Sequence, residues 1–143
     1  MTILVTGGLG YIGSHTVVEL LENNFDVVIV DNLSNTDKKI LAGIEQITGK
    51  TPAFYPIDLR SRSQIAQVLE AHKIDGCIHF AAFKAVGESQ VKPIDYYENN
   101  MVSLINLLQE FKERNISNFI FSSSCTVYGQ ADQMPINEEA PIK

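Results

Sequence analysis

Three glycines spaced three residues apart, Gly7, Gly10 and Gly13, follow an apolar run near the start of the chain. The run Ile3-Leu4-Val5 is typical of a buried parallel strand, and the residues after the glycines have the amphipathic spacing of a helix. A strand, a glycine turn and a helix in this order form the context in which such a pattern indicates a dinucleotide site. The spacing Gly-x-x-Gly-x-x-Gly differs from the more familiar Gly-x-Gly-x-x-Gly, but the physical requirements are similar.

Each of these glycines has a predicted role. Gly7 permits the sharp turn off the strand, Gly10 lets a pyrophosphate approach the backbone, and Gly13 lets the helix pack closely on the sheet. The amino terminus of the helix presents free N–H groups and the positive end of its dipole to phosphate oxygens. A glycine triplet is also found in ordinary strand-to-helix turns, so this pattern alone does not decide between the two interpretations.

An acidic residue after the second predicted strand favours dinucleotide binding. Residues 25–30 predict that strand, and Asp31 follows it, roughly 20 residues after the glycines. A carboxylate at this position accepts hydrogen bonds from an adenosine ribose and repels a 2′-phosphate, so NAD is favoured over NADP. The alternative is that Asp31 only caps the loop at 32–35. The glycines, the helix and the acid occur together at the spacing of a dinucleotide site, which favours a role for Asp31 in binding.

The composition limits the class of protein and its partners. A length of 143 residues predicts one domain, 1–143, and the contents of 45% hydrophobic and 20% charged residues are globular values. The net charge of −6 disfavours nucleic acid and anionic membranes, and no apolar run approaches the ~20 residues of a membrane span. Cys77 and Cys125 in apolar surroundings, and a chain that begins directly with a strand, predict a reduced cytoplasmic protein without a signal peptide.

Strands and helices are expected to alternate along the chain. The remaining predicted elements are strands at 53–57, 76–80 and 118–121 and helices at 37–48, 61–72 and 93–114. Five strands joined by helices predict an α/β fold with a doubly wound, Rossmann-like parallel sheet in the order 3-2-1-4-5. Pro56 cannot donate a ladder hydrogen bond, which agrees with an edge position for the third strand. The polar tail at 130–143 is expected to be loop.

Apolar spacing predicts which helix faces are buried. In the helix after the glycines, the predicted buried residues are Gly13, Val17, Leu20 and Leu21. In the helix at 37–48, they are Ile40, Leu41, Ile44 and Ile47. In the long helix at 93–114, an apolar stripe predicts a face that is mostly core, with the members Tyr97, Met101, Leu104, Ile105, Leu108 and Phe111.

The residues with notable chemistry gather where the predicted strands end. They are the glycine turn, Asp31, Asp58, residues 81–84 and the serines at 122–124. In an open α/β sheet, ligands bind outside the carboxyl ends of the strands, at the point where the strand order reverses. The sequence therefore predicts one site at this edge, between strands one and four.

Longer stretches resemble one family together. Residues 5–15, 31–35, 79–89, 96–100 and 122–129 are similar to the extended short-chain dehydrogenase/reductases, and most closely to their UDP-hexose 4-epimerases. The glycines are shared across that superfamily, whereas Phe-Lys-Ala-Val-Gly-Glu-Ser and Ser-Cys-Thr-Val-Tyr-Gly are far more specific. Sugar-nucleotide dehydratases tend to have an Asp-Glu pair where this chain has Cys125-Thr126, and this departure favours an epimerase.

The resemblance implies NAD as the cofactor and a UDP-hexose as the substrate. Family members oxidise C4 of the hexose and return the hydride to its other face, which interconverts UDP-glucose and UDP-galactose in galactose metabolism. The implied cofactor contacts are Gly7, Gly10, Tyr11, Ile12, Gly13, Asp31, Asn32, Leu33, Ser34, Asn35, Thr36, Asp58, Leu59, Phe80, Ala81, Ala82, Phe83, Lys84 and Asn99. Lys84 and Ser124 are implied to contact the substrate, with Ser124 as the catalytic serine at the sugar hydroxyl. The resemblance also implies a homodimer through the long helix.

The family's catalytic base is absent from this sequence. It is the tyrosine of a Tyr-x-x-x-Lys pair, and none of the five tyrosines here has a lysine four residues later. The family's substrate-binding half is absent as well, so we expect the cofactor half of an epimerase that has no turnover alone. The alternatives are an NAD-binding module without catalysis and another sugar-nucleotide enzyme, such as a dehydratase. The three histidines lack ligand spacing, so no metal site is expected.

Overall fold

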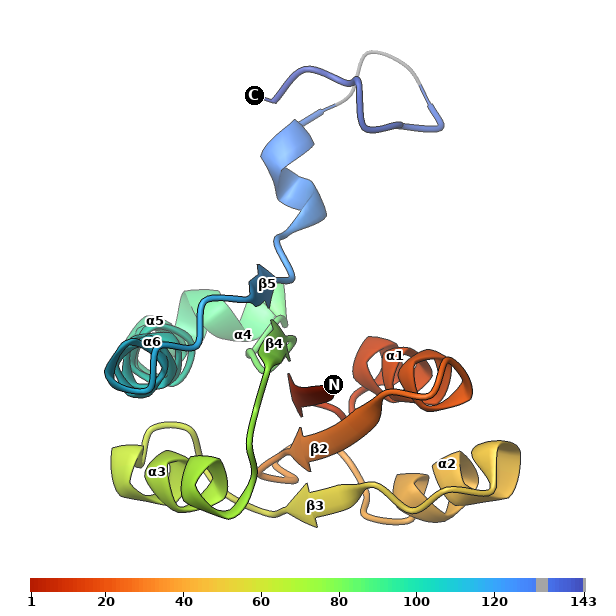
Figure 1. Ribbon diagram of the computed structural model, residues 1–143. Coiled ribbons are helices and arrows are strands. Elements are labelled where there is room, and N and C mark those ends of the chain that lie inside the picture. Colours follow the sequence, from red (N-terminus) through yellow and green to blue (C-terminus); the bar gives the residue numbers. More distant parts are fainter. Residues whose placement is uncertain (131–133, 143) are drawn as a thin grey trace.

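Five parallel strands form one sheet in the order β3-β2-β1-β4-β5, which confirms the predicted topology (Figure 1). The structure is a computed structural model that describes residues 1–130 and 134–142, so part of the predicted tail loop lies outside the described residues. The strands are β1 (Thr2–Thr6), β2 (Asp26–Val30), β3 (Ala53–Tyr55), β4 (Gly76–His79) and β5 (Phe119–Phe121). β3 and β5 are the edges, as Pro56 predicted for β3.

The helices follow the expected alternation, with one addition. They are α1 (Tyr11–Glu22), α2 (Ile40–Thr48), α3 (Arg62–Ala71), α4 (Val86–Val91), α5 (Pro93–Tyr97) and α6 (Ser103–Glu113). A π-helical turn, η1 (Glu98–Val102), joins α5 to α6, so the predicted long helix is α5, η1 and α6 in succession. The 3₁₀ turn η2 (Cys125–Tyr128) follows β5, and the sequence did not predict α4.

Two apolar clusters lie on opposite faces of the sheet. Helices α1 and α2 cover one face, and α3 and α6 cover the other (Figure 1). Alternate residues of the central strands serve the two sides: Val5 packs toward α1 and α2, and Leu4 packs toward α3 and α6. Because both faces are covered, consecutive residues inside the central strands are apolar, such as Ile3, Leu4 and Val5 in β1, which is the pattern that the sequence showed.

The buried face of α2 is shorter than predicted. Ile44 is buried, and Ile40 and Leu41 pack against its cluster, but Ile47 is 64% exposed. Ile47 lies in the last turn, just before Gly49 ends the helix in the left-handed conformation. The prediction for Ile47 was therefore wrong.

The apolar stripe of the long helix is mostly solvent-exposed, which corrects the predicted core face. Tyr97, Met101, Ile105 and Leu108 are 43–68% exposed, and of the predicted stripe only Phe111 is fully buried. The residues that face the core are Asn99, Ser103, Leu107, Glu110 and Phe111. Two polar members of this face have hydrogen-bond partners, and one of them is Asn99, which donates to Asn100. Glu110 accepts hydrogen bonds from Arg62 on α3 and from Arg114. Hydropathy alone therefore selected the wrong side of the helix.

No strand among the described residues pairs with the outer side of β5, and the described chain beyond it leaves the layered body (Figure 1). Ile120 and Phe121 on β5 are 62% and 54% exposed. Cys77 on β4 is buried as expected, whereas the side chain of Cys125 lies outside the described part of the chain. Across residues 1–130 and 134–142, no helix has both the length and the hydropathy that a bilayer crossing requires.

Candidate functional site

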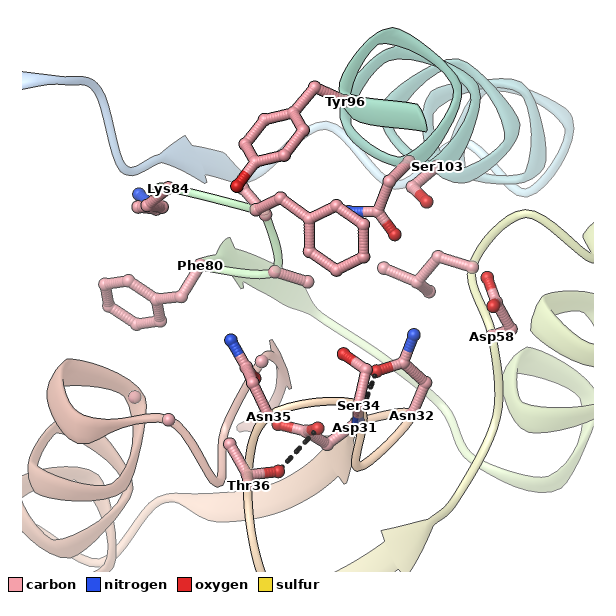
Figure 2. Close-up of a pocket in the computed structure, with 18 of the residues that line it drawn as sticks. Asp31, Asn32, Ser34, Asn35, Thr36, Asp58, Phe80, Lys84, Tyr96 and Ser103 are labelled. Atoms are coloured by element: carbon pink, nitrogen blue, oxygen red, sulfur yellow. Dashed lines mark hydrogen bonds between the residues drawn. The ribbon is translucent and has the colours of Figure 1, made fainter. Parts of the chain in front are cut away.

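A cleft of about 900 Å³ opens at the carboxyl ends of the strands, across the point between β1 and β4 where the strand order reverses. Its walls come from the β1–α1 turn, from the loops after β2, β3 and β4, and from the long helix. Figure 2 shows one wall formed by the loop after Asp31 and the opposite wall formed by Tyr96 and Ser103. The volume is within the range of small-molecule and cofactor sites.

The glycine turn has almost no room for side chains, except at its middle glycine. Gly7 has φ +67°, and a Cβ there would lie 2.7 Å from the backbone nitrogen of Ala81. A Cβ on Gly13 would lie 2.2 Å from the carbonyl oxygen of Gly7. A Cβ on Gly10 would approach only that same oxygen, at 3.2 Å, and Gly10 borders the cleft. Gly7 and Gly13 thus shape the turn, while Gly10 leaves space for a ligand.

The amino terminus of α1 points unsatisfied backbone donors at the cleft. The first helical hydrogen bond runs from the Ser14 nitrogen to the Gly10 carbonyl, 2.8 Å. The N–H groups of Tyr11, Ile12 and Gly13 precede it and have no helical partner, and all three residues line the cleft. Gly10 at the N-cap supplies no side-chain acceptor, and no acidic residue occupies the first turn. Free N–H groups and the helix dipole together suit a phosphate group.

Asp31 ties the glycine turn to the loop after β2. Its carboxylate accepts hydrogen bonds from the Leu9 nitrogen (3.2 Å), the Leu33 nitrogen (2.9 Å) and the Thr36 hydroxyl (3.0 Å; Figure 2). The loop capping that the sequence offered as an alternative is therefore present. Asp31 is only 7% exposed, yet it borders the cleft. A carboxylate with several lone pairs can hold this loop and still accept a ligand hydroxyl.

The loop after β3 places an ion pair at one end of the cleft. Arg60 donates to both carboxylate oxygens of Asp58, with Nη2 2.7 Å from Oδ2. This hydrogen-bonded guanidinium lowers the pKa of Asp58 below its ordinary value. Figure 2 shows Asn32 on the same side of the cleft as Asp58. Beside them, Leu59 is buried at 5% exposure and gives this end an apolar surface.

His79 is the last residue of β4, directly before the lining residue Phe80, and is almost fully buried. Its Nδ1 is 2.7 Å from the hydroxyl of Thr6 on the neighbouring strand, and its ring stacks on Phe121. Burial, with a smaller contribution from the charge of Lys84, lowers the pKa of His79 to about 4. The imidazole is therefore neutral at pH 7 and joins β1 to β4 as an uncharged group. In the part of the chain that the structure describes, no group of three metal-ligating residues occurs.

The structure brings the predicted cofactor residues together in this one cleft, with one exception. Leu33 does not line the cleft. Its side chain packs against the apolar cluster under α1 and α2, and its backbone N–H donates a hydrogen bond to Asp31. Ser124 does not line it either. Ser124 is exposed, its Oγ is 2.7 Å from the Thr126 hydroxyl, and it lies on the segment that leaves the sheet after β5. Ser122, two residues earlier, borders the cleft instead.

Several lining residues were not predicted. They are Val30, Ile57, Arg60, Ala85, Glu88, Lys92, Asp95, Tyr96, Glu98, Ser103 and Ser122. A signal for part of this set was available in the sequence. Lys92, Tyr96, Asn99 and Ser103 recur at steps of four, three and four residues, which is the spacing of one helix face.

The fold and the cleft define a class of protein, the doubly wound α/β domains of the Rossmann type. Within this class, the chain belongs to the NAD dependent epimerase/dehydratase family, whose sequence profile matches residues 3–143. A UDP-glucose 4-epimerase from Yersinia enterocolitica is 51% identical over 142 residues, which cover 99% of this chain. One from Klebsiella pneumoniae is 47% identical over 138 residues, which cover 96% of this chain and 99% of that sequence.

A solved structure shows the same arrangement. UDP-glucose 4-epimerase from Bifidobacterium longum, in complex with NAD+ and UDP, superposes with a TM-score of 0.93 at 48% identity over 100% of this chain. The chain spans 42% of the length of the Yersinia protein and 43% of the Bifidobacterium chain.

Proposed function

We propose that the cleft binds NAD and that this chain is the cofactor-binding part of a UDP-hexose 4-epimerase. The observation that carries the proposal is the convergence of the predicted cofactor residues, Leu33 apart, on one cleft at the carboxyl edge of the sheet. The Bifidobacterium longum relative, with the same fold over the full length of this chain, holds NAD+ and UDP. The glycine turn supports the proposal because it leaves open space at Gly10, where a pyrophosphate needs it.

Each part of the cleft suits a different part of the cofactor. The free N–H groups of Tyr11 and Ile12 would hold the pyrophosphate, and the loop at 31–36 would hold the adenosine ribose. Asp58 and Leu59 would contact the adenine, and residues 80–84 with Asn99 would line the nicotinamide half. NAD supplies a hydride acceptor and donor when bound. The residues of this chain would hold and orient it.

The roles of Lys84 and Ser124 toward the substrate remain proposals. Lys84 borders the cleft and brings a positive charge to it, which suits a phosphate or a ribose. Ser124 follows the strand β5, two residues beyond the lining residue Ser122. We propose that Ser124 hydrogen-bonds the sugar hydroxyl once substrate is bound in the intact enzyme.

We also propose that these 143 residues do not turn over UDP-hexoses alone. No tyrosine in the sequence has a lysine four residues later, so no lysine-activated phenolate is available to take the C4 hydroxyl proton. A positioned base typically contributes about 10²–10⁴ in rate. A coupled assay of UDP-galactose conversion on the purified chain tests this. Conversion above the level of a mock purification would overturn it.

The exposed stripe on the long helix supports a homodimer. Tyr97, Met101, Ile105 and Leu108 form an apolar surface on the outer side of this helix. Light scattering over a range of concentrations should show a dimer, and Ile105→Glu should dissociate it. A monomer at all concentrations would contradict the proposal.

Calorimetric titration of the purified chain with NAD is the direct test of the proposed cofactor. We expect one NAD per chain, as the single glycine turn requires. Absence of binding by a folded chain, shown by its circular dichroism, would overturn the proposal. Binding of NAD without conversion of UDP-galactose is what the cofactor-half interpretation predicts. If the longer parent were a dehydratase instead, its assay would yield a 4-keto-6-deoxy sugar rather than the epimer.

A further inference from the structure

The side chain of Asn100 joins the long helix to the loop after β4. Its Oδ1 accepts a hydrogen bond from the Phe83 nitrogen at 2.8 Å, and its Nδ2 donates to the Phe83 carbonyl oxygen at 3.1 Å. Oδ1 also accepts a third hydrogen bond, from the Nδ2 of Asn99 at 3.0 Å. One carboxamide thus contacts both polar backbone groups of Phe83 and orients its neighbour.

The loop at 81–84 depends on this side chain. Among the described residues, the loop makes no backbone–backbone hydrogen bond. Asn100 is therefore the group that satisfies the N–H and C=O of Phe83. The ring of Phe83 also packs near Tyr96, with centroids 5.4 Å apart. Lys84 follows Phe83 directly, so the two bonds from Asn100 that clamp the Phe83 backbone also restrict the position of the Lys84 backbone.

The same bond network sets the direction of the Asn99 carboxamide. Asn99 is 7% exposed and borders the cleft, and its amide nitrogen is engaged by Asn100. This bond uses one of the two N–H donors of Asn99, whereas the carboxamide oxygen accepts no hydrogen bond from the described residues and stays available to a ligand. Both asparagines lie in η1, the π-helical turn, and such turns interrupt helices frequently at functional sites.

We infer that Asn100 is a positioning residue for the cofactor wall of the cleft. It fixes the Phe83–Lys84 loop and turns the oxygen of Asn99 toward the ligand, so that Asn99 accepts a hydrogen bond from a donor such as a ribose hydroxyl or a carboxamide. Asn100 itself acts only through these two neighbours. The inference rests on the proposed function, because it takes NAD as the ligand of the cleft.

Asn100→Ala in the 143-residue chain tests the inference with two measurements. We expect hydrogen exchange of the Phe83 amide to accelerate by about tenfold or more, since its acceptor is gone. We expect NAD affinity to fall about tenfold, which corresponds to the loss of an ordered wall and one oriented acceptor. The matched control is Asn118→Ala, which removes one bond from an asparagine amide to the Asp75 carbonyl, away from the cleft lining. It should leave the Phe83 exchange rate and the NAD affinity unchanged.

A double-mutant cycle separates positioning from general stability. If Asn100 acts through Asn99, the losses in NAD affinity from Asn99→Ala and Asn100→Ala will not add in the double variant. Additive losses would overturn the coupling. Should Asn100→Ala fail to fold, the exchange rate of the Phe83 amide in the unsubstituted chain carries the test, because the bond to Asn100 should protect that amide. Unprotected exchange of the Phe83 amide in the unsubstituted chain, or unchanged exchange in Asn100→Ala, would overturn the clamp. If the unsubstituted chain binds no NAD while the Phe83 exchange rate responds as expected, the role of Asn100 in holding Phe83 stands, and NAD as the proposed cofactor is refuted.

Discussion

The glycine turn between β1 and α1 and the long helix of α5, η1 and α6 both line the cleft, but they are held in place differently. In the turn, backbone atoms approach so closely that Gly7 and Gly13 admit no side chain. In the helix, the face toward the core carries Asn99, Ser103 and Glu110, and the outer face carries exposed apolar residues. Backbone geometry thus determines the residues of the turn, whereas partners elsewhere in the chain determine the face of the helix.

This difference predicts that the turn and the helix respond differently to substitutions. A substitution in the turn acts through steric overlap with backbone or ligand, and its effect is large and local. A substitution on the helix acts through the loss of packing or of a hydrogen-bond partner, and its effect depends on which face it touches. The following predictions test this contrast.

The largest expected effect is on the turn. Gly10→Val should abolish measurable NAD binding, a loss of about 10³-fold or more, while the chain remains folded. The branched side chain would occupy the space proposed for the pyrophosphate. The fold should survive, because Gly10 has φ −68°, an angle open to other residues, and its Cβ would meet only one protein atom within 4 Å. Calorimetry with NAD and far-ultraviolet circular dichroism give the two readouts.

Gly43→Ala is the matched control for this variant. Gly43 lies on the exposed side of α2, and a Cβ there would meet nothing within 4 Å. Alanine should raise the free energy of unfolding by about 0.5–1 kcal/mol and leave NAD affinity unchanged. Normal NAD binding by Gly10→Val would show that the glycine turn does not hold the pyrophosphate.

The two faces of the long helix should respond unequally to the same type of change. Leu107→Ala should lower the free energy of unfolding by roughly 3 kcal/mol, because Leu107 is fully buried in the core. Met101→Ala should change it by less than about 0.5 kcal/mol in the monomer, because Met101 is 49% exposed. Urea unfolding at a concentration where the chain is monomeric measures both. Equal losses would refute the assignment of the faces.

The helix also shows why one part of the fold was predictable and another was not. The strand order, the turn and the convergence on the carboxyl edge follow from local patterns and from general topology, and they were predicted. The buried face of the long helix depends on Glu110, whose partner Arg62 is 48 residues away in sequence. Its second partner, Arg114, is only four residues away, but such an i,i+4 pair is just as typical of an exposed helix face. No local pattern therefore shows that this glutamate is buried, so hydropathy favoured the opposite face.

The residues that line the cleft were also predicted only in part. Residues at strand ends were found because parallel strands bring their carboxyl ends to one edge. Tyr96 and Ser103 were missed because they reach the cleft from the long helix, where the prediction considered the spacing of apolar residues only. Lys92 was missed as well, and it lies at the junction between α4 and α5. Ser124 was assigned by resemblance alone, and in the structure it lies outside the cleft lining.

A pH-dependent stability follows from the buried imidazole of His79, which hydrogen-bonds Thr6 just before the glycine turn. The folded-state pKa of His79, about 4, is below the ordinary value of 6.5, so the unfolded chain binds this proton more readily. The contribution of His79 is fully present above pH 6.5 and decreases as the pH falls from 6.5 to 4, by roughly 3 kcal/mol. Urea unfolding between pH 4 and 8 should show this slope, and His79→Gln should lack it.

Between pH 6.5 and 4, the contribution of His79 to stability can be measured separately from that of Asp58. The pKa of Asp58 is held below its ordinary value of 3.8 by Arg60, so the stability from that pair is lost only at lower pH. If the free energy of unfolding of the unsubstituted chain does not change between pH 6.5 and 4, the assignment of a buried neutral imidazole is contradicted.

The smallest expected effect is the preference between two cofactors, and it concerns the residue that ties the turn to the next loop. NAD should bind about tenfold or more tightly than NADP, because a 2′-phosphate would lie beside the carboxylate of Asp31, which is only 7% exposed and poorly screened. Asp31→Asn removes the charge, so the preference should narrow, although NAD affinity should also fall because the amide nitrogen cannot accept the bonds from the turn and the loop. Asp37→Asn, an exposed acid of the same segment that pairs with Lys39, should leave the preference unchanged. Calorimetric titrations of the three chains with both cofactors decide the matter: equal or tighter binding of NADP by the parent chain would mean that Asp31 only holds the loop, and that its charge does not select the cofactor.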